Sequence, residues 1–341
     1  MGQPGLFDLD QRYAQLSAHG DPLDILSTAI PWETFRPLLQ RVHLKDRKSA
    51  AGRKPYDPVL MFKVLTLQSL YNLSDEQAEY QIRDRLSFMR FLGLSLHDRV
   101  PDEKTIWLFR NTLSQQGVID QVFAQFQGFL DQQGYTAQHG TLVDARIVSA
   151  PTQRNTREEN QQIKAGTVPE AWDDQPAKRR QKDTDARWTQ HHGKSYYGYK
   201  NHVAVDVRHK LVRTYTVTPA ATHDSQALPT LLPTPNTRRA VWADSAYRSA
   251  EISTYLKAQG IENYIHYKGY RNHPLTAKRH ELNQRRSRIR VRVEHVFGFQ
   301  VNSMRSTVLR CIGLARARAK IGLQNVVYNM CRYTQLCKLA T

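Results

Sequence analysis

The sequence predicts an α/β protein in which an all-α N-terminal domain precedes a mixed β-sheet with flanking helices. Three observations support this prediction. Apolar residues recur at helical spacing up to about residue 135. Short β-branched segments then follow one another as in a meander, and after them helical and strand patterns alternate. We therefore expect two domains, at residues 1–135 and 136–341.

The N-terminal domain is expected to be a helical bundle. Residues 57–94 hold two apolar runs at mainly helical spacing, and between them Ser74 with Gln77 three residues later is typical of a helix start. A third helix is expected after Pro101-Asp102-Glu103, and a fourth in VIDQVFAQFQGFLDQQG, ending at Gly134. Nothing in this pattern identifies a recognition helix, so both DNA binding and dimerisation remain open for this domain.

The C-terminal domain is expected to begin with a strand in GTLVDARIVSA. Residues 152–194 contain Pro169, Pro176 and the run Lys178-Arg179-Arg180 with few large apolar side chains, which predicts a flexible basic insertion. The predicted elements after it are the hairpin YYGYKNHVAVDV and KLVRTYTVTPA, the helix SQALPTLL, the strand RAVWADS, the helix SAEISTYLKAQ, the strand IENYIHY and a long basic helical region through residue 300.

The composition points to an anionic partner and away from several classes of protein. With 49 Lys and Arg against 31 Asp and Glu, the formal charge of +18 attracts a polyanion such as DNA. The three cysteines, Cys311, Cys331 and Cys337, form neither a disulfide framework nor a zinc motif. No stretch approaches about 18 uninterrupted apolar residues, and no signal peptide is recognisable. We expect a cytoplasmic protein in contact with DNA and no membrane partner.

Three acidic residues stand out in this basic chain: Asp144 in GTLVDARIVSAP, Asp244 in AVWADSAYRS and Glu294 in RIRVRVEHVFGFQ. The two aspartates lie in predicted strands, where an ionised side chain is costly unless it is paired or bound to a cation. Glu294 lies on a predicted helix and shares a face with Arg290, one turn earlier. Carboxylates gathered from such distant positions repel one another, and Mg²⁺ or Mn²⁺ offsets that repulsion. The pattern indicates a metal site for phosphodiester chemistry on nucleic acid.

Two other acids compete for the same role. Asp206 also ends a predicted strand, but it precedes the hairpin turn and so belongs at the opposite end from a site near Asp244. Asp224 in THDSQ precedes a predicted helix, where an acid either caps the helix or lines the site.

Taken in order, the motifs resemble those of a known family. The motifs are LVDARIVSAP, GYKNHVAVD, THDSQALPTLL, WADSAYRS and RVRVEHVFGF. This arrangement is similar to that of bacterial DDE transposases of insertion sequences, particularly the insertion-sequence-five family within the insertion-sequence-four-like superfamily. PDEKTIWLFRNTL and the helical block before it resemble that family's N-terminal region, so the resemblance covers roughly residues 55–310.

The resemblance implies a ribonuclease-H-like catalytic domain with Asp144, Asp244 and Glu294 as catalytic metal ligands. It implies two Mg²⁺ or Mn²⁺ ions, with Asp144 bridging them, and double-stranded DNA as partner at both the element ends and the target. The enzyme is expected to cut at terminal inverted repeats and to join the 3′-hydroxyl ends to target DNA, working as a homodimer. His202, His223 and Asp224 are expected to support the site.

Two positions depart from the family pattern. Relatives often carry Tyr seven residues before the catalytic Glu and Lys seven after it, where this chain has Ser287 and Val301. The alternatives to a transposase are therefore a metal-dependent nuclease without strand transfer and a catalytically silent DNA-binding protein derived from a transposase. Residues 268–292 carry nine Lys and Arg against one acid, which suits tracking a DNA backbone. The predicted DNA-binding residues are Lys200, Lys268, Arg285, Arg286, Arg288, Arg290 and Arg292.

Overall fold

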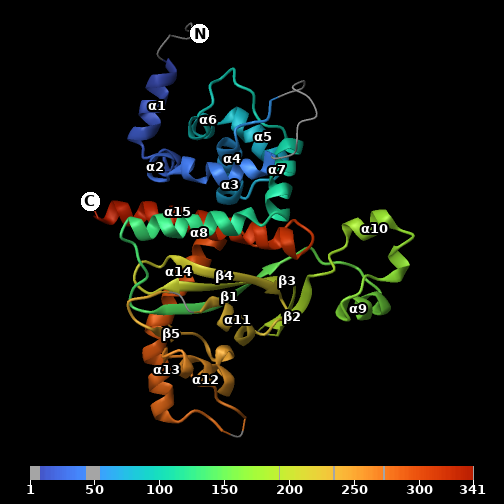
Figure 1. The fold of residues 1–341 in the computed structure, drawn as a ribbon, viewed down its shortest axis with the longest axis vertical. Helices are drawn as coiled ribbons and strands as arrows, with labels where there is room; N and C mark the ends of the chain where they lie inside the picture. The colour runs from blue at the N-terminus through green and yellow to red at the C-terminus, as the bar shows by residue number, and fades with distance from the viewer. Residues whose placement is uncertain (1–7, 44–53, 192, 233–234, 272, 341) are drawn as a thin grey trace. The chain divides into compact units, whose positions relative to one another are not determined.

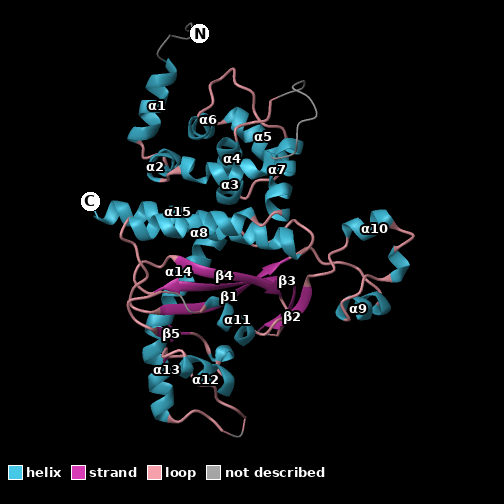
Figure 2. Ribbon diagram, viewed as in Figure 1, coloured by secondary structure: helices cyan, strands magenta, loops and turns pink. Residues whose placement is uncertain are grey.

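The computed structural model describes residues 8–43, 54–191, 193–232, 235–271 and 273–340 (Figure 1). It confirms a mixed α/β protein with a helical N-terminal part and a six-stranded mixed sheet (Figure 2). The chain divides into two compact units, residues 1–126 with 326–341 and residues 127–325. Within the described part of the chain, no helix is both long enough and apolar enough to cross a membrane.

The first unit is built from helices whose starts are fixed by side-chain caps. Asp57 accepts hydrogen bonds from two backbone N–H groups at the start of its most buried helix, α4. Ser74 and Gln77 form the capping box that the sequence predicts, and Asp102 caps the next predicted helix. The helices are α1 (Asp8–Ala18), α2 (Pro22–Ala29), α3 (Arg36–Gln40), α4 (Pro58–Tyr71), α5 (Asp75–Asp84), α6 (Leu86–Leu92), α7 (Glu103–Gln115) and α8 (Val118–Gln132), the last of which continues into the second unit.

The second unit contains one sheet with strand order β2-β3-β1-β5-β6, and β4 pairs with β3. The strands are β1 (Thr141–Ser149), β2 (Arg187–His191), β3 (Lys194–Asp206), β4 (Val212–Pro219), β5 (Ala240–Trp242) and β6 (Glu262–Asn263). Strands β1 and β3 pair antiparallel, whereas β5 lies parallel to both β1 and β6. The predicted hairpin is confirmed as β3 and β4, while β2 was not predicted and β6 is shorter than expected.

Side chains of β1 alternate between two apolar layers. Val143 packs with α11 (Asp224–Leu231) and α12 (Ala250–Ala258) on one face of the sheet. Val148 packs on the other face with the start of α15 (Leu314–Ala340). This alternation gives each face of β1 its own helical cover.

The predicted basic helical region is divided into α13 (Ala277–Arg290), a 3₁₀ turn η5 (Val291–Val293), α14 (Glu294–Gly298) and a π-helical turn (Phe299–Ser303).

Residues 152–194 differ from the predicted flexible loop, because they contain α9 (Arg157–Lys164) and α10 (Pro176–Gln181). The buried Glu159 organises them: its carboxylate accepts hydrogen bonds from Trp172 Nε1 at 2.6 Å and Lys178 Nζ at 2.7 Å. Glu159 also completes a capping box with Thr156 at the start of α9. A few buried polar contacts thus order a segment whose composition alone suggests a loop.

Candidate active site

Asp144 lies on β1, and Asp244 lies two residues after the end of β5, the parallel neighbour of β1. The register pairs Thr141 with Val241 and Leu142 with Trp242, and continuing it by two residues beyond the end of β5 brings Asp244 level with Asp144. Neighbouring strands are about 4.8 Å apart, and residues two positions apart share a face. Both carboxylates therefore leave the same face of the sheet, as the sequence pattern predicts for two ligands of one site.

The environment of Asp144 disfavours its negative charge. Burial raises the pKa of this carboxyl to about 6, against the opposing effects of Arg290 and of the Ala145 backbone N–H. The nearby charges of Asp244 and Asp224 raise the pKa further. Asp144 Oδ2 accepts a hydrogen bond from Arg290 Nη1 at 3.1 Å, and Oδ1 accepts one from Ala145 N at 2.9 Å. The guanidinium of Arg290 offsets only part of the free-energy cost of burying the Asp144 charge, so the site favours additional positive charge.

Asp244 caps the turn after β5 with one carboxylate oxygen and leaves the other oxygen outside that contact. Its Oδ1 accepts a hydrogen bond from Ala246 N at 2.8 Å and so begins the turn η4 (Ser245–Tyr247) directly after β5. This contact fixes the carboxylate at the strand's carboxyl end, where open α/β sheets hold ligands. The other oxygen is free of this capping role, so Asp244 can serve as a ligand without losing its turn.

Glu294 is the first residue of α14, and it is exposed. The preceding turn η5 contacts β1, which brings this part of the chain to the strand that carries Asp144. The sequence predicts one continuous helix on which Arg290 and Glu294 share a face, but η5 intervenes. Over four residues a 3₁₀ helix rotates by one full turn plus about 120°, whereas an α-helix rotates by one full turn plus about 40°. The side chains of Arg290 and Glu294 therefore point in more divergent directions than they would on a continuous α-helix.

The described residues do not present a finished three-ligand metal centre. Among them, no three His, Cys, Asp or Glu side chains are close enough together to hold an ion. The donor set of Asp144 and Asp244 nevertheless fits a hard divalent cation, because both groups are carboxylates and their charges act on each other. The structure thus brings Asp144 and Asp244 within electrostatic reach of each other and leaves Glu294 exposed at the start of α14.

The three predicted supporting residues have different surroundings. Asp224 forms an ion pair with Lys200, with Oδ1 and Nζ 2.7 Å apart, and its charge acts on Asp144. His223 caps α11 instead, through Nδ1 to Ser225. His202 is opposite Ala145 in the register, so its side chain leaves the other face of the sheet from Asp144.

Burial lowers the pKa of His202 to about 4, and its Nε2 lies 2.8 Å from the Thr218 hydroxyl. A neutral imidazole held in this way, on the far face of β3, is a core residue of the sheet. Of the predicted supporting group, only Asp224 lies within electrostatic reach of Asp144.

The predicted DNA-binding side chains differ in how far they are engaged by the protein. Arg288 and Lys268 are exposed, with Lys268 Nζ 5.8 Å from the centroid of the Tyr270 ring, whereas Arg285 pairs with Glu281 at 2.6 Å. Arg286 donates to the carbonyl oxygen of Ile265, and Arg292 donates to that of Val207. Arg290 contacts Asp144, and Lys200 contacts Asp224. The cluster on α13 is therefore partly a surface for a ligand and partly a set of internal ties.

Sequence reasoning missed His266, which continues the row of the two aspartates. β6 pairs with β5 in parallel, and backbone bonds from Tyr264 N to Val241 O and from His266 N to Ala243 O extend that pairing. His266 therefore lies level with Asp244. Its pKa is lowered chiefly by burial and by Arg290, and its Nε2 is 3.4 Å from Ser287 Oγ. Because β6 is so short, only the register reveals this position.

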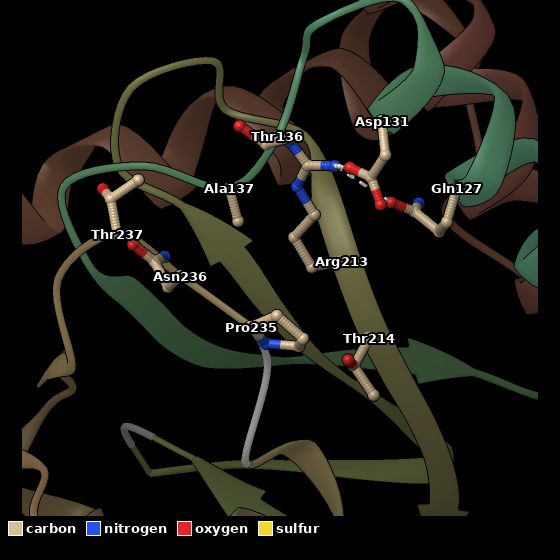
Figure 3. A pocket seen from close by; sticks show the side chains of 9 residues that line it. All are labelled: Gln127, Asp131, Thr136, Ala137, Arg213, Thr214, Pro235, Asn236 and Thr237. Carbon is tan, nitrogen blue, oxygen red and sulfur yellow. Dashed lines mark hydrogen bonds and ion pairs between the residues drawn. The ribbon is translucent and has the colours of Figure 1, made fainter.

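Asp206 behaves as the sequence predicts for a residue outside the site. It is opposite Thr141, at the start of β1, and it is fully buried. Its carboxylate accepts hydrogen bonds from Arg213 Nε and from two backbone N–H groups of the hairpin turn. Arg213 also reaches Gln127 and Asp131 along the wall of a cavity of about 560 Å³ (Figure 3). This aspartate holds the hairpin together.

Comparisons with known protein families match the two parts of the chain. A family model described as transposase DDE domain matches residues 135–330. The chain belongs to the transposase DDE domain family. A second model, described as transposase domain (DUF772), matches residues 10–112 of this DDE transposase. Membership of the family implies an enzyme that acts on DNA and depends on divalent metal ions.

Among solved structures, the chain is similar to one in the cryo-EM structure of the piggyBac transposase synaptic complex with hairpin DNA. The two chains are 12% identical, the match covers 94% of this chain and 76% of that one, and the TM-score is 0.46. A likeness this distant adds nothing to the family assignment.

Proposed function

We propose that this DDE transposase cuts DNA at the terminal inverted repeats of an insertion sequence and joins the 3′-hydroxyl ends to target DNA. The observation that carries the proposal is the proximity of Asp144, on β1, to Asp244, just after the parallel strand β5, with Arg290 bound to Asp144, in a chain of charge +18. Asp144, Asp244 and Glu294 are the proposed ligands of two Mg²⁺ or Mn²⁺ ions. The bound ions supply an activated oxygen nucleophile and stabilise the leaving oxygen.

The chain's own groups prepare the site for this chemistry. Asp144 presents its carboxylate from strand β1, and Asp244 presents its own from the capped turn at the end of β5, so both positions are fixed by regular structure. Arg290 offsets the charge of Asp144, and its buried Nε has no hydrogen-bond partner in the described parts of the chain, which leaves this donor for a phosphate oxygen. Glu294 is the proposed third ligand, and it begins α14 directly after η5, the turn that contacts β1.

The wider assignment follows from the same proposal. We propose a ribonuclease-H-like catalytic domain in residues 136–341, with 152–194 as its insertion, and a DNA-binding or dimerisation role for residues 1–135. The motifs favour the insertion-sequence-five family. Two protomers are needed to hold two element ends, so the proposed partner besides double-stranded DNA is a second copy of the chain, in the cytoplasm.

The proposal is tested by Mg²⁺-dependent cleavage and joining of a labelled fragment that carries the DNA flanking the coding region. Wild type is compared with Asp144→Asn, Asp244→Asn and Glu294→Gln, and with Asp206→Asn as a buried strand aspartate outside the site. We expect cleaved and joined products from wild type, their loss in the first three variants, and DNA binding retained in all three.

The outcomes separate the alternatives. Cleavage without joined product identifies a metal-dependent nuclease, and binding without cleavage identifies a silent DNA-binding protein. Cleavage retained by Glu294→Gln alone removes that residue from the metal site and leaves the two aspartates. Loss of activity in Asp206→Asn without loss of folding contradicts the assignment of that residue to the hairpin.

A further inference from the structure

Three arginines from different elements surround the ring of Tyr267. The guanidinium carbons of Arg248, Arg286 and Arg279 lie 4.1, 4.5 and 5.2 Å from the ring centroid. Arg248 follows η4, Arg279 and Arg286 are on α13, and Tyr267 follows β6. Contacts of this kind are favourable between each cation and the ring, but they gather three like charges within a small volume.

The charge of this arginine cluster is not balanced by carboxylates of the surrounding elements. Burial lowers the pKa of Arg248, and the charges of Arg286 and Arg279 lower it further, while only Tyr267 acts in the opposite sense. Hydrogen bonding from Arg286 lowers the pKa of Tyr267. No ion pair joins Arg248, Arg279 or Arg286 to a carboxylate of the described residues. Glu262 of β6 pairs with Arg238 at 2.6 Å, Glu281 of α13 pairs with Arg285, Asp244 caps η4, and Glu251 of α12 lies 3.5 Å from Ser249 Oγ.

The arginine cluster also contains a hydrogen-bond donor without a partner among the described residues. Arg248 Nε is buried and has no hydrogen-bond partner among the described residues. A buried donor without a partner is costly, and it is usually found where a ligand or an ordered water completes the bond. Arg238 provides the contrast, since it stacks on Trp242 and Tyr264 in the same way but has a carboxylate partner.

The cluster adjoins the candidate active site. Arg248 is four residues after Asp244, and Tyr267 directly follows His266, which is level with Asp244. Arg286 is one turn of α13 before Arg290, which contacts Asp144, and of its guanidinium nitrogens Nη1 donates to the carbonyl oxygen of Ile265. One helical turn spans 5.4 Å, which corresponds to roughly one or two nucleotides along a DNA strand.

We propose that Arg248, Arg279 and Arg286, arranged around Tyr267, form a seat for a backbone phosphate of DNA next to the reacting phosphodiester. This inference deepens the proposed function and rests on it for the position of the reacting group. A phosphate offers several acceptor oxygens to forked guanidinium donors and neutralises the cluster. The contact is to the backbone, so it positions the strand and reads no sequence.

The test measures binding of the full-length protein to a random-sequence DNA duplex at graded salt concentrations. The variants are Arg248→Gln, Arg286→Gln, the charge-preserving Arg248→Lys, and Arg238→Gln as the matched control. Each of the two cluster variants is expected to lower the slope of log affinity against log salt by about 1, the value for one lost phosphate contact. Arg248→Lys and Arg238→Gln are expected to keep the wild-type slope.

Cleavage of the flanking DNA fragment separates this inference from the proposed function. If wild type fails to cut but the slopes fall as expected, the phosphate seat stands and the transposase proposal fails. If wild type cuts but Arg248→Gln and Arg286→Gln keep the slope of Arg238→Gln, the phosphate seat is wrong. If Arg248→Lys also lowers the slope of log affinity against log salt, and its thermal unfolding midpoint falls, Arg248 has a packing role. This result also overturns the phosphate seat.

Discussion

Replacing Asp144 by Asn should make the metal-free protein more stable while abolishing its proposed chemistry. The pKa of Asp144 is raised from 3.8 to about 6, so its ionised form is disfavoured in the folded state. Each pKa unit corresponds to about 1.4 kcal/mol, so the charge costs about 3 kcal/mol at neutral pH. Asparagine keeps the shape of the neutral acid without the charge, and about 3 kcal/mol is therefore the upper limit of the gain.

The pH dependence of this gain has a definite sign. A carboxyl whose pKa is raised on folding favours the folded state most when it is protonated, and this contribution is lost as pH rises through the folded-state value. The wild type should therefore lose stability relative to Asp144→Asn between about pH 4 and pH 6, and the difference should be complete by about pH 7. Below pH 4 the two proteins should be nearly equal.

Thermal unfolding in EDTA at pH 5 and pH 8 measures the effect. The second unit has about 200 residues, for which 1 kcal/mol moves the midpoint by about 2–4 °C, so the expected rise at pH 8 is up to about 12 °C. Asp206→Asn is the matched control: it weakens a buried pair with Arg213 and should lower the midpoint. Adding Mg²⁺ should stabilise wild type and leave Asp144→Asn unchanged.

A midpoint for Asp144→Asn below that of wild type at pH 8 would refute this reasoning, because the carboxylate would then be a net stabilising group. A gain of equal size at pH 5 and pH 8 would also count against it, since the effect would not come from ionisation.

Three further predictions concern the surroundings of the site. Gly198→Ala should destabilise the protein by more than about 3 kcal/mol in denaturant unfolding, because its φ is +152° and an added Cβ would lie 2.3 Å from the carbonyl oxygen of Val148. Glu159→Gln should speed proteolytic cleavage within the insertion while leaving the rest of the fold intact, since it weakens the bond to Lys178. Asn325→Ala should cost about 2–4 kcal/mol, measured by chemical denaturation, because two buried amides that bond to Asn325 lose their partner.

The sequence predicts the parts of the site that depend on local pattern. Asp144 and Asp244 follow β-branched or apolar runs that form strands, and alternation then fixes the face of each side chain. The capping box of Ser74 and Gln77 is equally local, because both partners lie within one turn. In each case the residues that decide the structure are within a few positions of the residue that is predicted.

The parts that the sequence does not predict depend on contacts between distant residues. The helices of the insertion form around the buried Glu159, which needs Trp172 and Lys178 at a spacing that no periodicity encodes. His266 gains its position from the pairing of β6 with β5. The 3₁₀ turn before Glu294 follows from the packing of η5 against β1. Propensity favours a continuous helix there, and tertiary contacts prevail over it.

A buried polar network lies on the same face of β1 as Asp144. Arg146, two residues further on the same face, donates to Gln300 and to the Ser306 backbone, and Gln300 bonds Asn325, which exchanges hydrogen bonds with Asn201. A buried hydrogen-bond network of this kind holds β1 against the helices in one arrangement. With β1 fixed, the Asp144 carboxylate keeps its partial access to water. Above about pH 6 its charge is therefore balanced only in part, by Arg290, and a bound cation would balance the rest.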